Sequence, residues 1–141
     1  MNKVSVTEEE RVTMDGTTPL NRGTVFPRPD VEGMSLSIVI PAYNEEGAVR
    51  HTVEDIRAEM EPLGIPYEII VIDDGSTDRT LEIARTTGAI VDSNQVNTGY
   101  GASLKRGIRL AQYEYVAIID ADGTYPARYL PPMLAMCRNQ D

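Results

Sequence analysis

The chain has 141 residues, a formal net charge of −9 and a single cysteine, Cys137. Its length allows one domain with its own core, and its negative charge argues against nucleic acid as a partner, because phosphate backbones bind basic surfaces. One cysteine rules out an internal disulfide framework and favours a reducing, cytoplasmic compartment. The sequence shows neither an apolar stretch of the roughly 20 residues that span a bilayer nor an N-terminal secretion signal.

Residues 1–34 contain prolines, threonines and an acidic triplet without a sustained apolar period. We interpret them as a flexible N-terminal lead-in. From residue 35 to residue 141 short apolar segments alternate with amphipathic ones, which predicts one domain of strands and helices.

The predicted strands are short and rich in isoleucine and valine, and they cover residues 36–40, 67–72, 88–91 and 115–119. The helices that follow them are marked by Val49 to Met60, by Leu81 and Ala84, by Leu104, Ile108 and Ala111, and by Leu130 to Cys137 after a start at Pro126. This alternation predicts an α/β fold with a mostly parallel, Rossmann-like sheet and helices on both of its faces.

Polar residues gather where three of these strands end, at residues 41–46, 73–76 and 120–123. The carboxyl ends of parallel strands meet at one edge of a sheet, and ligands of such sheets bind beyond that edge. We therefore expect the three clusters to form one site.

Asp120 and Asp122 directly follow the last predicted strand, with Ala121 between them and Gly123 after them. Alternate residues of a strand point to the same side, so the two carboxylates can converge on one Mg²⁺ or Mn²⁺ ion. Such an ion completes its coordination with phosphate oxygens and water, which favours a nucleoside diphosphate as ligand. Acids that only cap the following helix are the alternative interpretation.

Tyr43 follows a strand and a proline, and its ring is placed to lie against a nucleobase, with Glu45 within reach of the same ligand. Asp73 ends the neighbouring strand, where a carboxylate commonly accepts hydrogen bonds from ribose or base. The alternatives are a core aromatic for Tyr43 and, for Glu45 and Glu46, charges that complement a helix N-terminus.

Residues 97–102 contain a glycine-rich turn into a helix, a pattern that can cradle phosphate or can simply pack a helix closely on a sheet. Lys105 and Arg106 on that helix could approach a diphosphate or face solvent. His51, the only histidine, is predicted to be a surface residue.

Taken together, residues 37–46, 69–78, 97–102 and 120–123 resemble the motifs of glycosyltransferase family 2, whose members are inverting enzymes of the GT-A fold. The Asp-Ala-Asp form, with a Tyr-Pro shortly after it, is most similar to the branch that transfers mannose or glucose to dolichyl or polyprenyl phosphate. The resemblance implies transfer of a hexose from a UDP- or GDP-linked sugar to such a lipid phosphate, at the cytoplasmic face of a membrane.

The resemblance also implies roles for individual residues. Asp122 would be the chief metal ligand, with Asp120 beside it. The residues that would contact the nucleotide sugar are Pro41, Tyr43, Glu45, Val71, Asp73, Asp120 and Ala121.

Two departures from the family pattern stand out. Thr124 occupies the position where many relatives in the branch carry a glutamine that assists the metal. The resemblance covers only residues 34–141, which correspond to the nucleotide-binding half of a truncated GT-A domain. We therefore expect an acceptor half to be supplied elsewhere, or self-association through uncovered apolar surface.

Two other functions fit parts of the sequence. The segment 117–124 also matches the apolar strand and Asp-x-Asp-Gly-Thr signature of haloacid-dehalogenase-type phosphatases, with Asp120 as nucleophile and Asp122 as acid/base. A noncatalytic nucleotide-binding module is the third hypothesis. The sequence names no catalytic base, and it leaves the sugar, the nucleobase and the acceptor open.

Overall fold

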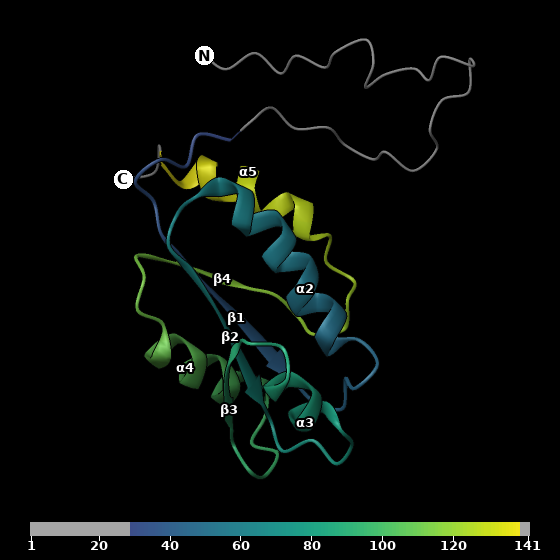
Figure 1. Ribbon diagram of the computed structural model, residues 1–141. Coiled ribbons are helices and arrows are strands. Elements are labelled where there is room, and N and C mark those ends of the chain that lie inside the picture. The colour runs from purple at the N-terminus through teal and green to yellow at the C-terminus, as the bar shows by residue number, and fades with distance from the viewer. Residues whose placement is uncertain (1–28, 139–141) are drawn as a thin grey trace, which may run out of the picture.

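The computed structural model describes residues 29–138, which form a four-stranded sheet with helices on both faces (Figure 1). The elements in chain order are β1 (Leu36–Ala42), α2 (Val49–Met60), the 3-10 turn η1 (Glu61–Leu63), β2 (Tyr67–Asp73), α3 (Thr80–Arg85), β3 (Ile90–Ser93), α4 (Tyr100–Leu110), β4 (Tyr115–Ile118), the 3-10 turn η2 (Ala127–Tyr129) and α5 (Leu130–Cys137). The strand order is β3-β2-β1-β4 and every pair is parallel. The predicted parallel α/β fold is thus confirmed.

Two predicted elements begin later than the sequence pattern indicates, and all four strands end one or two residues away from their predicted ends. The third strand begins at Ile90 rather than at residue 88, because the backbone N–H groups of Thr86 and Thr87 still donate to carbonyls of α3. The last helix begins at Leu130, because Pro126 has an extended backbone and a single 3-10 turn separates it from α5. Both differences arise from local hydrogen bonding that an apolar pattern does not encode.

The core lies on both faces of the central strands, as expected for a parallel sheet that is covered twice. Ile38, Ile40 and Val71 pack on the face that carries α2, α3 and α5. Val39 and Ile70 pack on the opposite face, beneath α4. Successive residues of each strand therefore alternate between two apolar layers.

The packed part of the chain begins before the predicted domain boundary at residue 35. Val31 and Met34 are buried, with 4% and 5% of their surface exposed, and they belong to the core on the α2 face. The predicted flexible lead-in otherwise falls on residues 1–28, which lie outside the described residues. The division into a lead-in and a domain stays a prediction.

Strand β4 forms one edge of the sheet, and among residues 29–138 no strand pairs with its outer side. Val116 and Ile118 on this strand are 41% and 43% exposed. An apolar hollow of about 300 Å³ separates β4 from α5. Self-association remains a prediction, and this exposed edge of the sheet is the surface through which it would occur. In the part of the chain that the structure describes, no helix is both long enough and apolar enough to cross a membrane.

Helix α4 lies unusually close to the sheet at Gly107. A Cβ atom added there would sit 2.3 Å from Cγ1 of Val39, whose side chain is fully buried in β1. Real Cβ atoms do not approach other atoms so closely, so only glycine fits between helix and strand. This contact sets the depth at which α4 sits on the sheet.

We predict that Gly107→Ala lowers the free energy of unfolding by about 1–3 kcal/mol through overpacking against Val39. Gly101→Ala on the same helix is the matched control, because its added methyl group would meet no atom within 4 Å. That control is expected to raise stability by up to about 1 kcal/mol, since alanine favours helix over glycine. Urea unfolding of both variants measures the difference, and shifts of equal sign and size would contradict the packing argument.

Candidate nucleotide-sugar site

A cavity of about 470 Å³ opens at the carboxyl edge of the sheet, between the ends of β1 and β4 and the start of α4. It brings together most of the side chains that the sequence predicts for the site. The lining residues are Pro41, Ala42, Tyr43, Glu45, Asp74, Asn97, Gly99, Tyr100, Ser103, Asp120, Ala121 and Asp122. The expected convergence of polar clusters at one edge is therefore present in the structure.

The loop after β1 is held in place by hydrogen bonds to the loop after β2. The backbone N–H of Asn44 donates to Oγ of Ser76 at 2.9 Å, and Oδ1 of Asn44 accepts from the N–H of Thr77 at 2.8 Å. The N–H of Glu45 donates to Oγ1 of Thr80 at 2.8 Å. Asn44 has a positive φ of 52°, which asparagine tolerates better than most residues. These bonds fix the backbone that directly follows Tyr43.

Tyr43 is 44% exposed and lines the cavity, so it is not a core aromatic. The carboxylate of Glu46 binds the start of α3 rather than the N-terminus of the helix that follows it in the sequence. Its Oε2 accepts from the backbone N–H of Arg79 at 3.1 Å. Glu45 remains the carboxylate of this loop that lines the cavity.

Two predicted residues, Val71 and Asp73, do not line this cavity. Val71 is fully buried in the core, and Asp73 is 1% exposed. Val71 packs in the core beneath α2 and α3, and Asp73 lines a separate hollow of about 390 Å³ together with Ser76, Ser93 and Arg106. The contact of Val71 and Asp73 with the nucleotide sugar stays a prediction.

The carboxylate of Asp73 has a local structural environment instead. Its Oδ2 accepts hydrogen bonds from the N–H of Ser76 and from Oγ of Ser93, both at 3.3 Å. Its Oδ1 is buried and has no hydrogen-bond partner among residues 29–138. Replacing Asp73 is expected to disturb folding as well as any ligand contact, because its side chain is enclosed.

The next residue, Asp74, is the one that reaches the cavity. Its Oδ1 accepts from the N–H and Oγ1 of Thr98 at 2.8 and 3.0 Å and from Nδ2 of Asn94 at 2.8 Å. Its Oδ2 accepts from the N–H of Gly99 at 2.9 Å. Burial raises the pKa of Asp74, but the hydrogen bonds from Thr98, Asn94 and Gly99 together outweigh it and leave the pKa below its ordinary value.

The loop that Asp74 holds passes directly over Gly75. A Cβ atom at Gly75 would lie 2.5 Å from the backbone N of Asn97 and from the carbonyl carbon of Val96, and Gly75 has a φ of +71°. Only glycine fits under the crossing chain at this point. Sequence analysis missed both Asp74 and this crossing, although the pairing of an Asp-Gly turn with a later Asn-x-Gly turn is the signal that could have found them.

The glycine-rich turn leads into α4, which begins at Tyr100 after Gly99. Gly99, Tyr100 and Ser103 line the cavity, so the N-terminus of this helix opens toward it. The close packing of α4 on the sheet, at Gly107, is present as well. A role of the turn in binding phosphate stays a prediction.

The acidic pair lies at the other wall of the cavity, past the end of β4. Asp120 and Asp122 are exposed and Ala121 is buried between them. Oδ1 of Asp120 accepts from the hydroxyl of Tyr100 at 3.4 Å. Oδ1 of Asp122 accepts from the N–H and Oγ1 of Thr124 at 3.0 and 2.7 Å, and these bonds lower the pKa of Asp122 below its ordinary value.

These two carboxylates form a donor set that fits a magnesium or manganese ion. Residues 29–138 contain no group of three or more histidine, cysteine or acidic side chains placed to hold a metal. An ion bound here would therefore take its other ligands from phosphate and water, as Mg²⁺ does when one or two carboxylates hold it.

The predicted surface position of His51 is confirmed, since its side chain is 71% exposed beside Asp55.

A parallel sheet covered by helices on both faces, with an acidic pair and a glycine-rich turn around one cavity at its carboxyl edge, is the arrangement of the GT-A fold of glycosyltransferases. The chain belongs to glycosyl transferase family 2, which it matches over residues 37–141. This membership favours a glycosyltransferase over the haloacid-dehalogenase alternative.

Two curated relatives and one solved structure illustrate the likeness. The low-salt glycan biosynthesis hexosyltransferase Agl6 of Haloferax volcanii is 40% identical over 107 residues, which are 76% of this chain and 25% of that protein. The dodecaprenyl-phosphate galacturonate synthase of Rhizobium johnstonii is 34% identical, over 86% of this chain and 37% of that protein. The mannosyltransferase PcManGT of Pyrobaculum calidifontis, solved with GDP-Man and Mn²⁺, has a TM-score of 0.69 at 25% identity, over 79% of this chain and 35% of that one. The chain thus spans a quarter to somewhat over a third of the length of these proteins.

We predict that Asp74→Asn lowers the free energy of unfolding at pH 7 by about 1–3 kcal/mol, because an amide group cannot accept all the bonds that the carboxylate accepts. The pKa of Asp74 is lowered in the folded state, so its stabilising effect is complete above the unfolded value near about 3.9 and declines as the pH falls through the folded value. The difference in free energy of unfolding between wild type and Asp74→Asn should therefore become smaller below about pH 4. Urea unfolding across pH 3–7 measures this difference, and a difference that did not change with pH would contradict the stabilising role of the ionised Asp74.

Proposed function

We propose that this chain is the nucleotide-sugar-binding part of a metal-dependent, inverting glycosyltransferase that transfers a hexose from a UDP- or GDP-linked sugar to a polyprenyl or dolichyl phosphate. The observation that carries the proposal is the meeting of Tyr43, Glu45, Asp120 and Asp122 around one cavity at the carboxyl edge of the sheet. A lipid-phosphate acceptor would place the reaction at the cytoplasmic face of a membrane. The names of several relatives support that acceptor class.

Five of the lining residues have a proposed part in binding the donor. Tyr43 presents its ring to the nucleobase and Glu45 accepts from base or ribose. Asp120 contacts the nucleotide, Ala121 leaves room beside it, and Asp122 is the chief ligand of Mg²⁺ or Mn²⁺. When bound, the metal neutralises charge on the departing nucleoside diphosphate.

Geometry rather than a strong base would drive the transfer itself. An acceptor phosphate is already anionic, so it can attack the anomeric carbon from the face opposite the diphosphate without losing a proton to the protein. We assign no catalytic base. The acceptor would be held by residues outside the described cavity.

We predict that UDP or GDP binds tightly only with Mn²⁺ or Mg²⁺ present, and that Asp122→Asn weakens this binding about tenfold or more, a loss of one strong ligand. Asp55→Asn is the matched control, since Asp55 is an exposed aspartate on α2, remote from the cavity. Calorimetric titrations with and without metal measure both variants. Wild-type affinity of Asp122→Asn, or binding of equal strength without metal, would disprove the metal assignment.

Tyr43→Ala is expected to weaken nucleotide binding about fivefold or more, because a stacked ring contributes about 1 kcal/mol beyond area burial. Its melting temperature should change little, because the side chain is 44% exposed. Tyr43→Phe retains the ring and should bind almost as well as wild type. Equal loss in both variants would assign the effect to the hydroxyl rather than to stacking.

The last prediction separates a transferase from a noncatalytic nucleotide-binding module. Correct placement of the acceptor can supply roughly 7–11 kcal/mol of a barrier, and the lining residues described here account for the donor alone. We expect these 141 residues to bind UDP-glucose or GDP-mannose with Mn²⁺ but to transfer little sugar to polyprenyl phosphate. Radiolabelled transfer assays measure this, and robust multiple turnover would show that the acceptor site lies within this chain.

A further inference from the structure

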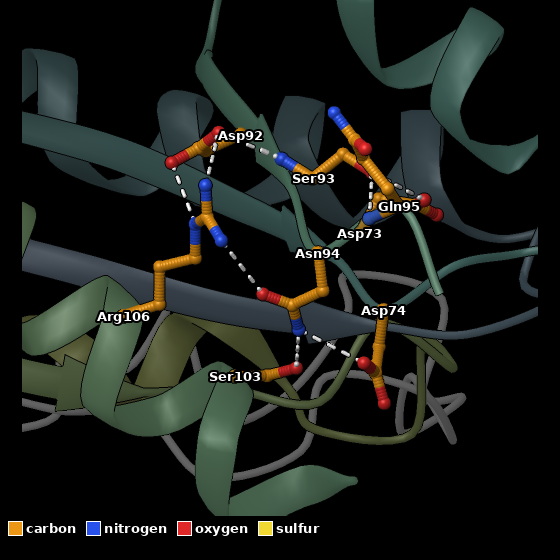
Figure 2. A network of polar contacts seen from close by, with 8 residues as sticks. All are labelled: Asp73, Asp74, Asp92, Ser93, Asn94, Gln95, Ser103 and Arg106. Carbon is orange, nitrogen blue, oxygen red and sulfur yellow. Dashed lines mark hydrogen bonds and ion pairs between the residues drawn. The ribbon is translucent and has the colours of Figure 1, made fainter. Parts of the chain in front are cut away.

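Arg106 lies on α4 but outside the cavity, where it binds the end of β3. Its Nε donates to Oδ2 of Asp92 at 2.7 Å and its Nη2 donates to Oδ1 of the same carboxylate at 3.2 Å. The remaining nitrogen, Nη1, donates to Oδ1 of Asn94 at 3.2 Å (Figure 2). Such a two-pronged contact fixes the plane of the guanidinium group and so directs its third nitrogen.

Arg106 and Asp74 together determine which way the amide of Asn94 points. With the amide oxygen accepting from Arg106, the Nδ2 group donates to Oδ1 of Asp74 at 2.8 Å and to Oγ of Ser103 at 3.0 Å. The reverse orientation would set an NH₂ group against the guanidinium and an amide oxygen against the carboxylate of Asp74. Both contacts would be repulsive, so Arg106 holds the amide of Asn94 in the orientation that donates to Asp74.

The effect of this orientation reaches the wall of the cavity through Asp74. The carboxylate that Asn94 binds is the one that accepts from the backbone N–H groups of Thr98 and Gly99. Gly99 lines the cavity, directly before the first residue of α4. Figure 2 shows the series from Arg106 through Asn94 to Asp74.

We propose that Arg106 is a positioning residue for the nucleotide-sugar site: through Asn94 and Asp74 it fixes the glycine-rich turn, and thereby the start of α4, in the geometry that binds the donor. This inference rests on the proposed function for its ligand. The series of hydrogen bonds from Arg106 to Asp74 does not depend on which ligand binds. Neither Arg106 nor Asp92 lines the cavity, so their effect on the ligand is indirect.

The test compares Arg106→Lys with Arg106→Gln. Lysine keeps the charge but cannot bind Asp92 with two nitrogens while it orients Asn94, so both variants should behave alike. In ligand-free protein we expect the amide hydrogens of Thr98 and Gly99 to exchange about tenfold faster or more, with the amide of Ile70 inside β2 unchanged. The dissociation constant for UDP or GDP with Mn²⁺ should rise about tenfold in both variants.

Arg109→Gln is the control for charge, because Arg109 is exposed on the same helix and its loss removes the same positive charge. It should leave the exchange of Thr98 and Gly99 unchanged and alter nucleotide affinity less than about twofold. Full retention of affinity by Arg106→Lys, or an equal loss in Arg109→Gln, would show that charge rather than position matters and would overturn the proposal.

Asp92→Asn serves if the Arg106 variants do not fold, since it keeps the shape of the side chain and weakens only the ion pair. Asp92→Asn is expected to speed amide exchange at Thr98 and Gly99 and to weaken nucleotide binding, each by less than the Arg106 variants do. Unchanged exchange at Thr98 and Gly99 would overturn the proposal. If the wild-type chain bound neither UDP nor GDP with Mn²⁺, the proposed function would fail. The exchange measurements would still decide whether Arg106 orders the turn.

Discussion

The buried carboxylate of Asp74 is the constraint on which the rest of the site depends. It is 5% exposed, and its two oxygens accept four hydrogen bonds from three residues of the segment between β3 and α4. A buried ionised group is tolerated only when donors replace the water that it has lost. The segment is therefore held to the end of β2 wherever the protein is folded. The start of α4, and with it one wall of the cavity, takes its position from this requirement.

The other walls of the cavity are held by different means. The loop that carries Tyr43 and Glu45 is bound to the β2–α3 loop by backbone N–H groups, so its side chains need not serve as anchors. Asp120 makes one long contact, at 3.4 Å, to the hydroxyl of Tyr100. Asp122 is the exception, because its Oδ1 accepts two hydrogen bonds from Thr124. The other groups proposed to meet the ligand make no short side-chain hydrogen bond within the described residues, whereas Asp74 beneath them accepts four. A binding site needs this division, because a saturated side chain loses hydrogen bonds when it turns to a ligand.

Sequence reasoning predicted the parts of this structure that depend on local pattern. The isoleucine-rich segments and helical stripes gave the parallel sheet and the edge where Tyr43, Glu45 and Asp122 meet. Asp73 was assigned the contact with ribose or base, whereas Asp74 is the residue that lines the cavity, because adjacent strand residues point to opposite sides and the apolar run at residues 69–72 does not show which side faces the cavity. The contact of Asp73 stays a prediction. The contact of Arg106 with Asp92 could not be predicted either, because Asp92 lies 14 residues away in the sequence and falls outside the predicted limits of its strand.

The negative charge around the cavity explains why a metal ion would be needed to bind a diphosphate there. Four of the lining residues are acidic, namely Glu45, Asp74, Asp120 and Asp122, and none of the lining residues within the described chain is a lysine or arginine. Two like charges 4 Å apart repel by about 4 kcal/mol at an effective dielectric constant of 20, so a diphosphate cannot approach the acidic pair unaided. The N-terminus of α4 supplies only about half a positive charge. A divalent cation held by Asp122 would reverse the sign of that interaction, and this is the physical support for the proposed metal at an edge that is otherwise acidic.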